Sequence, residues 1–138
     1  MKILIIDAQG GGIGKQLTSA VKQIMPSADI TAVGTNTAAT TAMLKAGADH
    51  AATGENAVIV AARKADLIAG PIGIVIADSL YGEITPAMAA AVAQSGAVRV
   101  LIPYSHCDNI IIGSGDRGIG EYVAMAAEKI RDILSSST

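Results

Sequence analysis

The sequence is poor in cysteine and in aromatic residues. Cys107 is the only cysteine, so the chain cannot form an internal disulfide, and a reducing compartment is the simplest expectation. The aromatic residues are three tyrosines, without any phenylalanine or tryptophan. The bases of single-stranded nucleic acids stack on aromatic side chains that lie next to basic ones, and the sequence contains no such arrangement.

Charged residues are also few, and neither sign dominates. They make up 16% of the sequence, and the formal net charge is −2. Basic residues form no block or stripe, so the electrostatic signature of a nucleic-acid-binding protein is missing. The apolar runs are too short to span a bilayer, and Asp7 interrupts the one that would otherwise suggest a signal peptide. We therefore expect a soluble, cytoplasmic protein with no nucleic-acid or membrane partner.

Small apolar side chains are what the sequence has in abundance. Hydrophobic residues account for 51% of the 138 residues, and the core must be built from Ile, Val, Leu, Met and Ala. This length suits a single domain over residues 1–138. Alanine-rich helices pack closely against a sheet, but so high an apolar share also fits a face that is shared with a second copy. We expect a homo-oligomer.

Short apolar runs alternate with amphipathic stretches, which is typical of an α/β fold with a mostly parallel sheet. The sequence predicts five strands, at residues 2–7, 29–34, 50–53, 66–70 and 98–103, and a possible sixth, edge strand at 109–113. Helices are predicted at residues 13–25, 36–45, 56–64, 85–96 and 119–134. The segment 71–80 is apolar all round, and because a crossover connection is needed there we predict a buried helix over 73–80.

The handedness of the connections predicts how these elements are arranged. Right-handed crossovers give a Rossmann-like three-layer sandwich with strand order 3-2-1-4-5. The flavodoxin-like order 2-1-3-4-5 is the alternative, if residues 50–53 do not form a strand. In such sheets ligands bind beyond the carboxyl ends of the strands, so the segments that follow the strands are where a site is expected.

The segment after the first strand is the strongest functional signal. The strand ends at Asp7, a glycine-rich loop follows, and a helical pattern begins at Ile13. A strand, a glycine loop and a helix in this order bare backbone N–H groups that attract anions. We predict that a nucleotide or another phosphate-containing ligand binds here, at Asp7, Gln9, Gly10, Gly11, Gly12, Ile13, Gly14 and Lys15.

The ends of the other strands supply further candidate residues. Polar and glycine residues follow the second, third and fifth strands, and we predict that they line the rest of the pocket: Thr35, Asn36, Gly54, Glu55, Asn56, Ser105 and His106. Turn geometry by itself explains part of this enrichment, although it explains three consecutive glycines less well. Two histidines and one cysteine do not have the spacing of zinc ligands, and no metal is predicted.

The glycine loop departs from three known patterns. Gly10 and Gly12 fit the dinucleotide fingerprint, but Lys15 stands at its third glycine, and the second strand lacks the following acid. Residues 12–14 match the end of the short-chain dehydrogenase loop, but no tyrosine has a lysine four residues after it. Gln16 stands where a Walker loop needs a hydroxyl for Mg²⁺. These departures argue against dehydrogenase and NTPase chemistry.

A second glycine segment, at residues 113–118, matches the dinucleotide fingerprint letter for letter. The helix after it is followed by no second parallel strand, so the βαβ unit that the fingerprint requires is missing. We interpret the segment as a flexible loop from which Arg117 can reach a ligand.

Three carboxylates lie in suggestive places. Asp7 can hold a ligand hydroxyl or a water-bound Mg²⁺, or it can accept N–H groups of its own loop. Glu55 is expected in the first turn of a helix, where negative charge is favourable. Glu83 belongs to a loop that precedes a helix cap. One alternative function is therefore a small transferase or hydrolase that uses Asp7, Glu55 or His106, and another is a non-catalytic oligomeric scaffold or regulator.

Several segments together resemble a known family. They are residues 7–15, 34–36, 43–48, 52–57, 70–74 and 82–86. The sequence is similar over residues 1–107 to a small bacterial family, the domain of unknown function 3842, and less so from Asp108 onward. The resemblance implies a bacterial origin and one shared domain, and it implies no catalytic residues.

Overall fold

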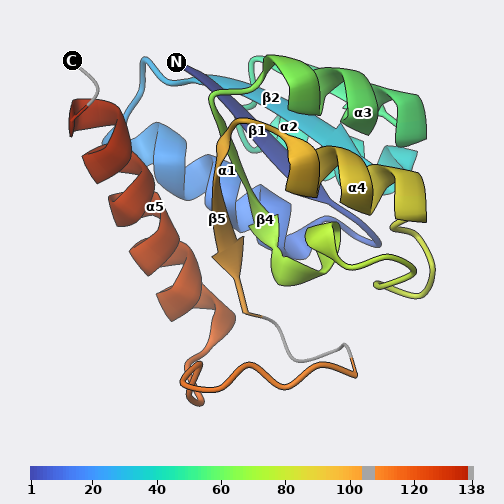
Figure 1. The fold of residues 1–138 in the computed structure, drawn as a ribbon. Coiled ribbons are helices and arrows are strands. Elements are labelled where there is room, and N and C mark those ends of the chain that lie inside the picture. The colour runs from blue at the N-terminus through green and yellow to red at the C-terminus, as the bar shows by residue number, and fades with distance from the viewer. Residues whose placement is uncertain (104–107, 137–138) are drawn as a thin grey trace.

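The computed structural model describes residues 1–103 and 108–136. Its frame is a five-stranded parallel sheet of order β3-β2-β1-β4-β5 (Figure 1). The strands are β1 (Lys2–Asp7), β2 (Asp29–Gly34), β3 (His50–Thr53), β4 (Leu67–Pro71) and β5 (Val98–Ile102). The α/β class and the predicted order 3-2-1-4-5 are confirmed, and the alternative order is wrong because β3 pairs with β2.

Helices cover both faces of this sheet. They are α1 (Gly12–Ile24), α2 (Thr37–Lys45), α3 (Glu55–Lys64), α4 (Pro86–Gln94) and α5 (Ile119–Ser136), with a short 3-10 helix, η1 (Ile72–Val75). In Figure 1, α3 and α4 lie together on one side of the strands, and α5 lies on the other side with α1. Among the described residues, no helix combines the length and the apolar character that crossing a bilayer requires.

The central strand β1 serves both cores of the molecule. Ile3 and Ile5 pack with the buried residues of α1, α2 and α5, whereas Leu4 and Ile6 pack with those of α3 and α4. This alternation follows from the two-residue period of a strand, and each of the four side chains is at most 1% exposed. A buried central strand therefore fixes the position of the residue at its carboxyl end.

Two helices begin where their capping residues predict. The Asn36 side chain accepts a hydrogen bond from the backbone N–H of Ala39 at the start of α2. Thr85 does the same for the N–H of Met88, and Pro86 occupies the first turn of α4. Both arrangements satisfy N–H groups that have no partner within the helix.

The predicted buried helix over residues 73–80 is wrong. Only η1 is helical there, and residues 76–84 form turns in which Asp78, Leu80 and Tyr81 have left-handed backbones. The segment closes on itself through a hydrogen bond from the N–H of Asp78 to the carbonyl of Ile84. The loop buries Leu80 and Ile84 without a helix, so its apolar composition did not require one.

The predicted sixth strand at residues 109–113 is also wrong. The segment has no strand structure, and Ile110 and Ile112 are 89% and 92% exposed. Figure 1 shows it running past the end of β5, beyond the edge of the sheet, where it has no strand beside it. A run of β-branched residues favours a strand only where a partner strand lies within reach.

Candidate functional site

Asp7 binds the loop that follows its own strand. It is 5% exposed, its Oδ1 accepts the N–H of Ala8 at 2.8 Å, and its Oδ2 accepts the N–H of Gly14 at 2.7 Å. Burial raises the pKa of Asp7 above its ordinary value, although hydrogen bonds from the backbone of Gly14, Ala8 and Ile13 oppose the shift. Asp7 therefore has the structural role predicted for it, because its carboxylate accepts N–H groups of its own loop, and its contact with a ligand stays a prediction.

Glu83 reaches the same region from the loop before α4. Its Oε1 accepts hydrogen bonds from the N–H of Gln9 at 2.9 Å, the hydroxyl of Thr35 at 2.6 Å and the Asn36 Nδ2 at 2.9 Å. Burial raises the pKa of Glu83, but the hydrogen bonds from Thr35, Gln9 and Asn36 outweigh it and leave the pKa below its ordinary value. Glu83 thus ties together the loops that follow β1 and β2.

Sequence reasoning noted Glu83 but did not include it among the ligand-binding residues. Glu83 is 74 residues from Gln9 and 48 from Thr35, and no local spacing joins them. The contact depends on the turns of residues 76–84, and the sequence predicts a helix over 73–80 in place of the first of these turns.

The glycines of the loop divide into two kinds. At Gly11, φ is 73°, and an added Cβ would lie 2.9 Å from the Cα and the carbonyl oxygen of Ala39. At Gly14 an added Cβ would lie 2.5 Å from the Met43 Sδ. Gly11 and Gly14 are therefore required for packing against α2. Gly10 and Gly12 have neither a positive φ nor any atom within 4 Å of an added Cβ, so both border open space.

The amides of the loop divide in the same way. The N–H groups of Ala8 and Gly14 donate to Asp7, that of Gln9 donates to Glu83, and that of Gly11 donates to the carbonyl of Ala8. Within the part of the chain that the structure describes, no hydrogen bond uses the N–H of Gly10 or of Gly12. These two amides lie at the start of α1, where the helix dipole is positive.

A cleft of about 210 Å³ lies against these two glycines. One wall is the loop itself together with Gln16 of α1, and the other is formed by Pro71, Leu80 and Ile119. The cleft therefore lies at the carboxyl end of the sheet, where the Rossmann-like topology predicts a ligand.

The structure places the other predicted site residues in several positions. Lys15 is exposed and lines a different hollow, on the outer side of α1. Glu55 and Asn56 are exposed at the start of α3 and do not line the cleft, and Gly54 donates its N–H to the carbonyl of Gly34. Ser105 and His106 lie outside the described residues.

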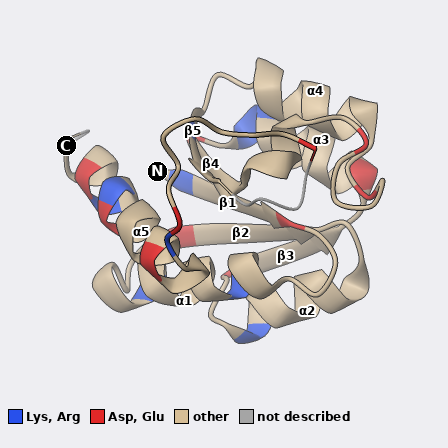
Figure 2. Ribbon diagram, turned by 90° about the horizontal axis from the view of Figure 1, so that it is seen from below, with Lys and Arg blue, Asp and Glu red and all other residues tan. Residues whose placement is uncertain are grey.

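The second glycine segment does not reach the cleft either. Arg117 lines a separate hollow of about 600 Å³ beside α5 and lies 3.9 Å from the carboxylate of Glu121. Among residues 1–103 and 108–136, no group of three or more His, Cys, Asp or Glu residues is placed to hold a metal ion. Figure 2 shows acidic and basic residues dispersed over several elements.

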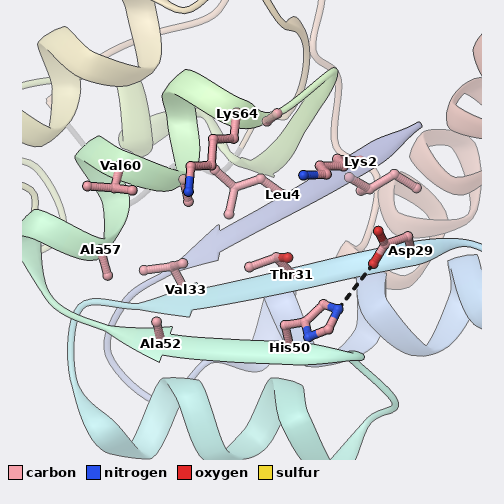
Figure 3. A pocket seen from close by; sticks show the side chains of 13 residues that line it. Lys2, Leu4, Asp29, Thr31, Val33, His50, Ala52, Ala57, Val60 and Lys64 are labelled. Carbon is pink, nitrogen blue, oxygen red and sulfur yellow. Dashed lines mark ion pairs between the residues drawn. The ribbon is translucent and has the colours of Figure 1, made fainter.

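An apolar groove of about 320 Å³ runs along the other edge of the sheet (Figure 3). Strands β2 and β3 form its floor and α3 forms its wall, and the His50 Nε2 lies 3.6 Å from the Asp29 Oδ1 at one end. All four residues of β3 are exposed. The groove lies on the face of the sheet rather than at the carboxyl ends, and its lining includes Thr31, Val33, Ala52, Ala57, Val60 and Lys64.

Comparison with known proteins finds a similar structure and a matching sequence family. The structure is similar to that of a dodecameric FMN-dependent UbiX-like decarboxylase from Escherichia coli O157:H7. The TM-score is 0.53 at 17% sequence identity, over 98% of this chain and 95% of that chain, and so low an identity supports a shared fold alone. The comparison with curated protein sequences yields no match. Residues 2–135 match the family described as a domain of unknown function (DUF3842), and the chain therefore belongs to that family.

Proposed function

We propose that this protein binds a nucleotide or another phosphorylated small molecule in the cleft beside the glycine loop. The observation that carries the proposal is the pair Gly10 and Gly12, which border open space and whose amides make no hydrogen bond among the described residues. Glycine is needed where another group must approach the backbone closely. A phosphate at this point would accept two N–H groups at the positive end of α1.

The neighbouring carboxylates limit how the ligand binds. Asp7 already holds the amide of Gly14, so the phosphate depends on Gly10 and Gly12, with the side chain of Gln16 beside them. At about 210 Å³ the cleft is smaller than the roughly 300–1,000 Å³ typical of drug-sized ligands. It therefore suits the phosphate end of a ligand whose remainder extends past Pro71 and Leu80. Contacts with Ile13, Lys15, Thr35, Asn36, Gly54, Glu55, Asn56, Ser105 and His106 stay predictions.

Isothermal titration with inorganic phosphate, ATP, NADP, coenzyme A, S-adenosylmethionine, sugar phosphates and FMN tests the proposal. FMN is included because the structurally similar decarboxylase is FMN-dependent. At least one of these compounds is expected to bind and to shift the amide NMR signals of Gly10 and Gly12. A folded wild-type protein that binds none of them contradicts the proposal.

The variant Gly12→Leu provides a sharper test. Position 12 has room for a side chain, so leucine is expected to leave the fold intact while it fills the cleft. Binding should weaken by about tenfold or more, which corresponds to roughly 1.4 kcal/mol. The matched control is Gly96→Leu, because Gly96 precedes β5 at the opposite end of the strands and also borders open space. Equal affinity in both variants would place the ligand elsewhere.

We also propose that the protein associates with copies of itself through the β3 edge. The four residues of β3 are exposed, and the adjoining groove is lined mostly by apolar side chains. An edge strand without proline, bulge or lysine is open to pairing with another strand. If β3 pairs with β3 of a second copy about a two-fold axis, this edge is covered in both copies. The structurally similar decarboxylase is a dodecamer.

The cytoplasm is the compartment in which we propose that this protein works. The basis is the lone cysteine, Cys107, because proteins of oxidising compartments commonly carry paired cysteines. Fractionation of cells that express the chain would test this location.

A further inference from the structure

The loop between η1 and α4 has an unfavourable backbone. Asp78, Leu80 and Tyr81 have φ values of 64°, 54° and 58°, and Gly82 follows with 80°. Residues other than glycine, asparagine and aspartate seldom adopt the left-handed region, so the backbones of Leu80 and Tyr81 persist only where surrounding contacts hold them. The contacts that hold this loop therefore indicate what it does.

One set of contacts anchors the base of the loop. Ser79 is buried and donates its hydroxyl to the carbonyl of Gly73, while Leu80 and Ile84 pack in the core beneath α4. The tip of the loop differs from its base, because Tyr81 is 93% exposed and does not anchor the loop. The hydrogen bonds to the loops that follow β1 and β2 come from the Glu83 side chain.

Glu83 holds three donors on one oxygen atom. A backbone N–H from Gln9, a hydroxyl from Thr35 and an amide N–H from Asn36 all converge on the Glu83 Oε1, at 2.6–2.9 Å. These are the donor types that bind a phosphate or carboxylate oxygen in proteins. They come from the loops after β1 and β2 rather than from the loop that carries Glu83. The donor set is therefore an oxyanion subsite that a protein carboxylate fills.

This subsite is continuous with the glycine-loop cleft. Gln9 lines the cleft and also donates its N–H to Glu83. Leu80 lines the cleft as well, and it belongs to the same loop as Glu83. A ligand that extends from Gly10 and Gly12 thus meets the donors of Gln9, Thr35 and Asn36 only if Glu83 moves away.

We propose that Glu83 is a built-in occupant of this subsite, and that a phosphate group of the ligand replaces it while the loop of residues 78–84 opens. This inference rests on the proposed function, because it concerns the same cleft. Opening lets Leu80 and Tyr81 return to ordinary backbone angles, which favours release, whereas the packing of Leu80 and Ile84 in the core opposes it. In the ligand-free protein Glu83 competes with the ligand. The apparent affinity is then the affinity of the open form multiplied by the fraction of molecules in which the loop is open.

Two substitutions of Glu83 test the competition, with inorganic phosphate as the probe. Glu83→Ala frees the three donors and removes a negative charge. Glu83→Asp keeps the charge, but its carboxylate is one methylene too short to reach the same donors. Both variants are expected to bind phosphate about tenfold or more tightly than wild type, because the internal competitor is gone. Glu128→Ala is the control, since it removes an exposed charge from α5 and should leave the affinity unchanged.

The outcomes separate this inference from the proposed function. If wild type binds phosphate compounds in the titration panel and the folded Glu83 variants bind no better, Glu83 is only a structural clamp and this inference is overturned. If only Glu83→Ala gains affinity, the gain comes from the lost charge, which also overturns it. Circular dichroism establishes folding, and if Glu83→Ala does not fold, the more conservative Glu83→Asp decides. If neither wild type nor the variants bind any compound, the proposed function fails as well.

Discussion

Asp7 and Glu83 both accept backbone N–H groups, yet their pKa values move in opposite directions. For Asp7 the cost of burial is larger than the gain from the hydrogen bonds of Gly14 and Ala8, and its pKa is raised. For Glu83 burial is the largest single effect and raises its pKa, but the bonds from Thr35, Gln9 and Asn36 together outweigh it and lower its pKa. Asp7 is thus a fixed part of the loop, whereas Glu83 is near enough to solvent to be exchanged for another anion.

The substitution Asp7→Asn tests the structural role of Asp7. Asparagine has one carbonyl oxygen, so the N–H of either Ala8 or Gly14 must face an amide NH₂ group. We expect the free energy of unfolding near neutral pH to fall by about 1–3 kcal/mol, the usual cost of an unsatisfied buried donor. Urea unfolding measures the change, and Asp116→Asn, on an exposed loop, is the control and should have no effect.

The difference in unfolding free energy between wild type and Asp7→Asn should depend on pH, because the pKa of Asp7 is raised in the folded protein. A carboxyl group whose folded pKa lies above its unfolded value binds more protons in the folded state, so its contribution to stability falls as pH rises through that range. The asparagine side chain of the variant cannot titrate, and the difference between wild type and variant should therefore be larger in mild acid than near neutral pH. A difference in unfolding free energy that widens as the pH rises would contradict a raised pKa for Asp7.

At the scale of the elements, α1 and α2 approach each other through glycine. Gly11 lies against the backbone of Ala39, and Gly14 lies against the side chain of Met43. The close approach of these helices fixes the loop after β1, which carries the amides of Gly10 and Gly12. The loop is therefore shaped by packing at two glycines and left open at the other two.

The pair Gly11→Ala and Gly10→Ala tests this division. An alanine at position 11 would need a left-handed backbone and would meet main-chain atoms of Ala39, which cannot move aside as a side chain can. We expect a loss of about 2 kcal/mol or more of unfolding free energy for Gly11→Ala. For Gly10→Ala we expect a change within about 0.5 kcal/mol. Thermal unfolding measures both, and equal losses would show that the division is wrong.

The accuracy of the sequence predictions depends on how local each signal is. The five strands of the sheet and the helices that follow Asn36 and Thr85 depend on residues that are neighbours in the chain, and these predictions are confirmed. The predictions for segments 73–80 and 109–113 are wrong because the first region folds into turns that close on themselves and the second segment has no partner strand. Within the site, nothing near Gln9 in the sequence shows that Glu83 takes its amide.

At the scale of the whole molecule, the two edges of the sheet are unlike each other. At the β5 edge, Val98 and Arg99 are exposed, whereas Ile102 packs with the buried residues of α5 in one of the two cores. The β3 edge is uncovered, and the groove between β3 and α3 leaves Thr31 partly exposed (Figure 3). The β3 groove and the glycine-loop cleft share no lining residue, so the proposed self-association through β3 would not block the proposed ligand site.

The substitution Ala52→Lys tests self-association through this edge. Ala52 lies on β3 and lines the groove, so a lysine there places a charge on the apolar floor. If two copies pair about a two-fold axis at β3, the substitution also brings two like charges together across the axis. We expect the dissociation constant of the oligomer to rise by about tenfold or more, which corresponds to roughly 1.4 kcal/mol. Light scattering over a concentration series measures the mass, and Ala124→Lys, on the exposed side of α5, should leave it unchanged. A wild-type protein that is monomeric at every concentration, or an oligomer that Ala52→Lys leaves intact, would show that β3 is a free edge and not an interface.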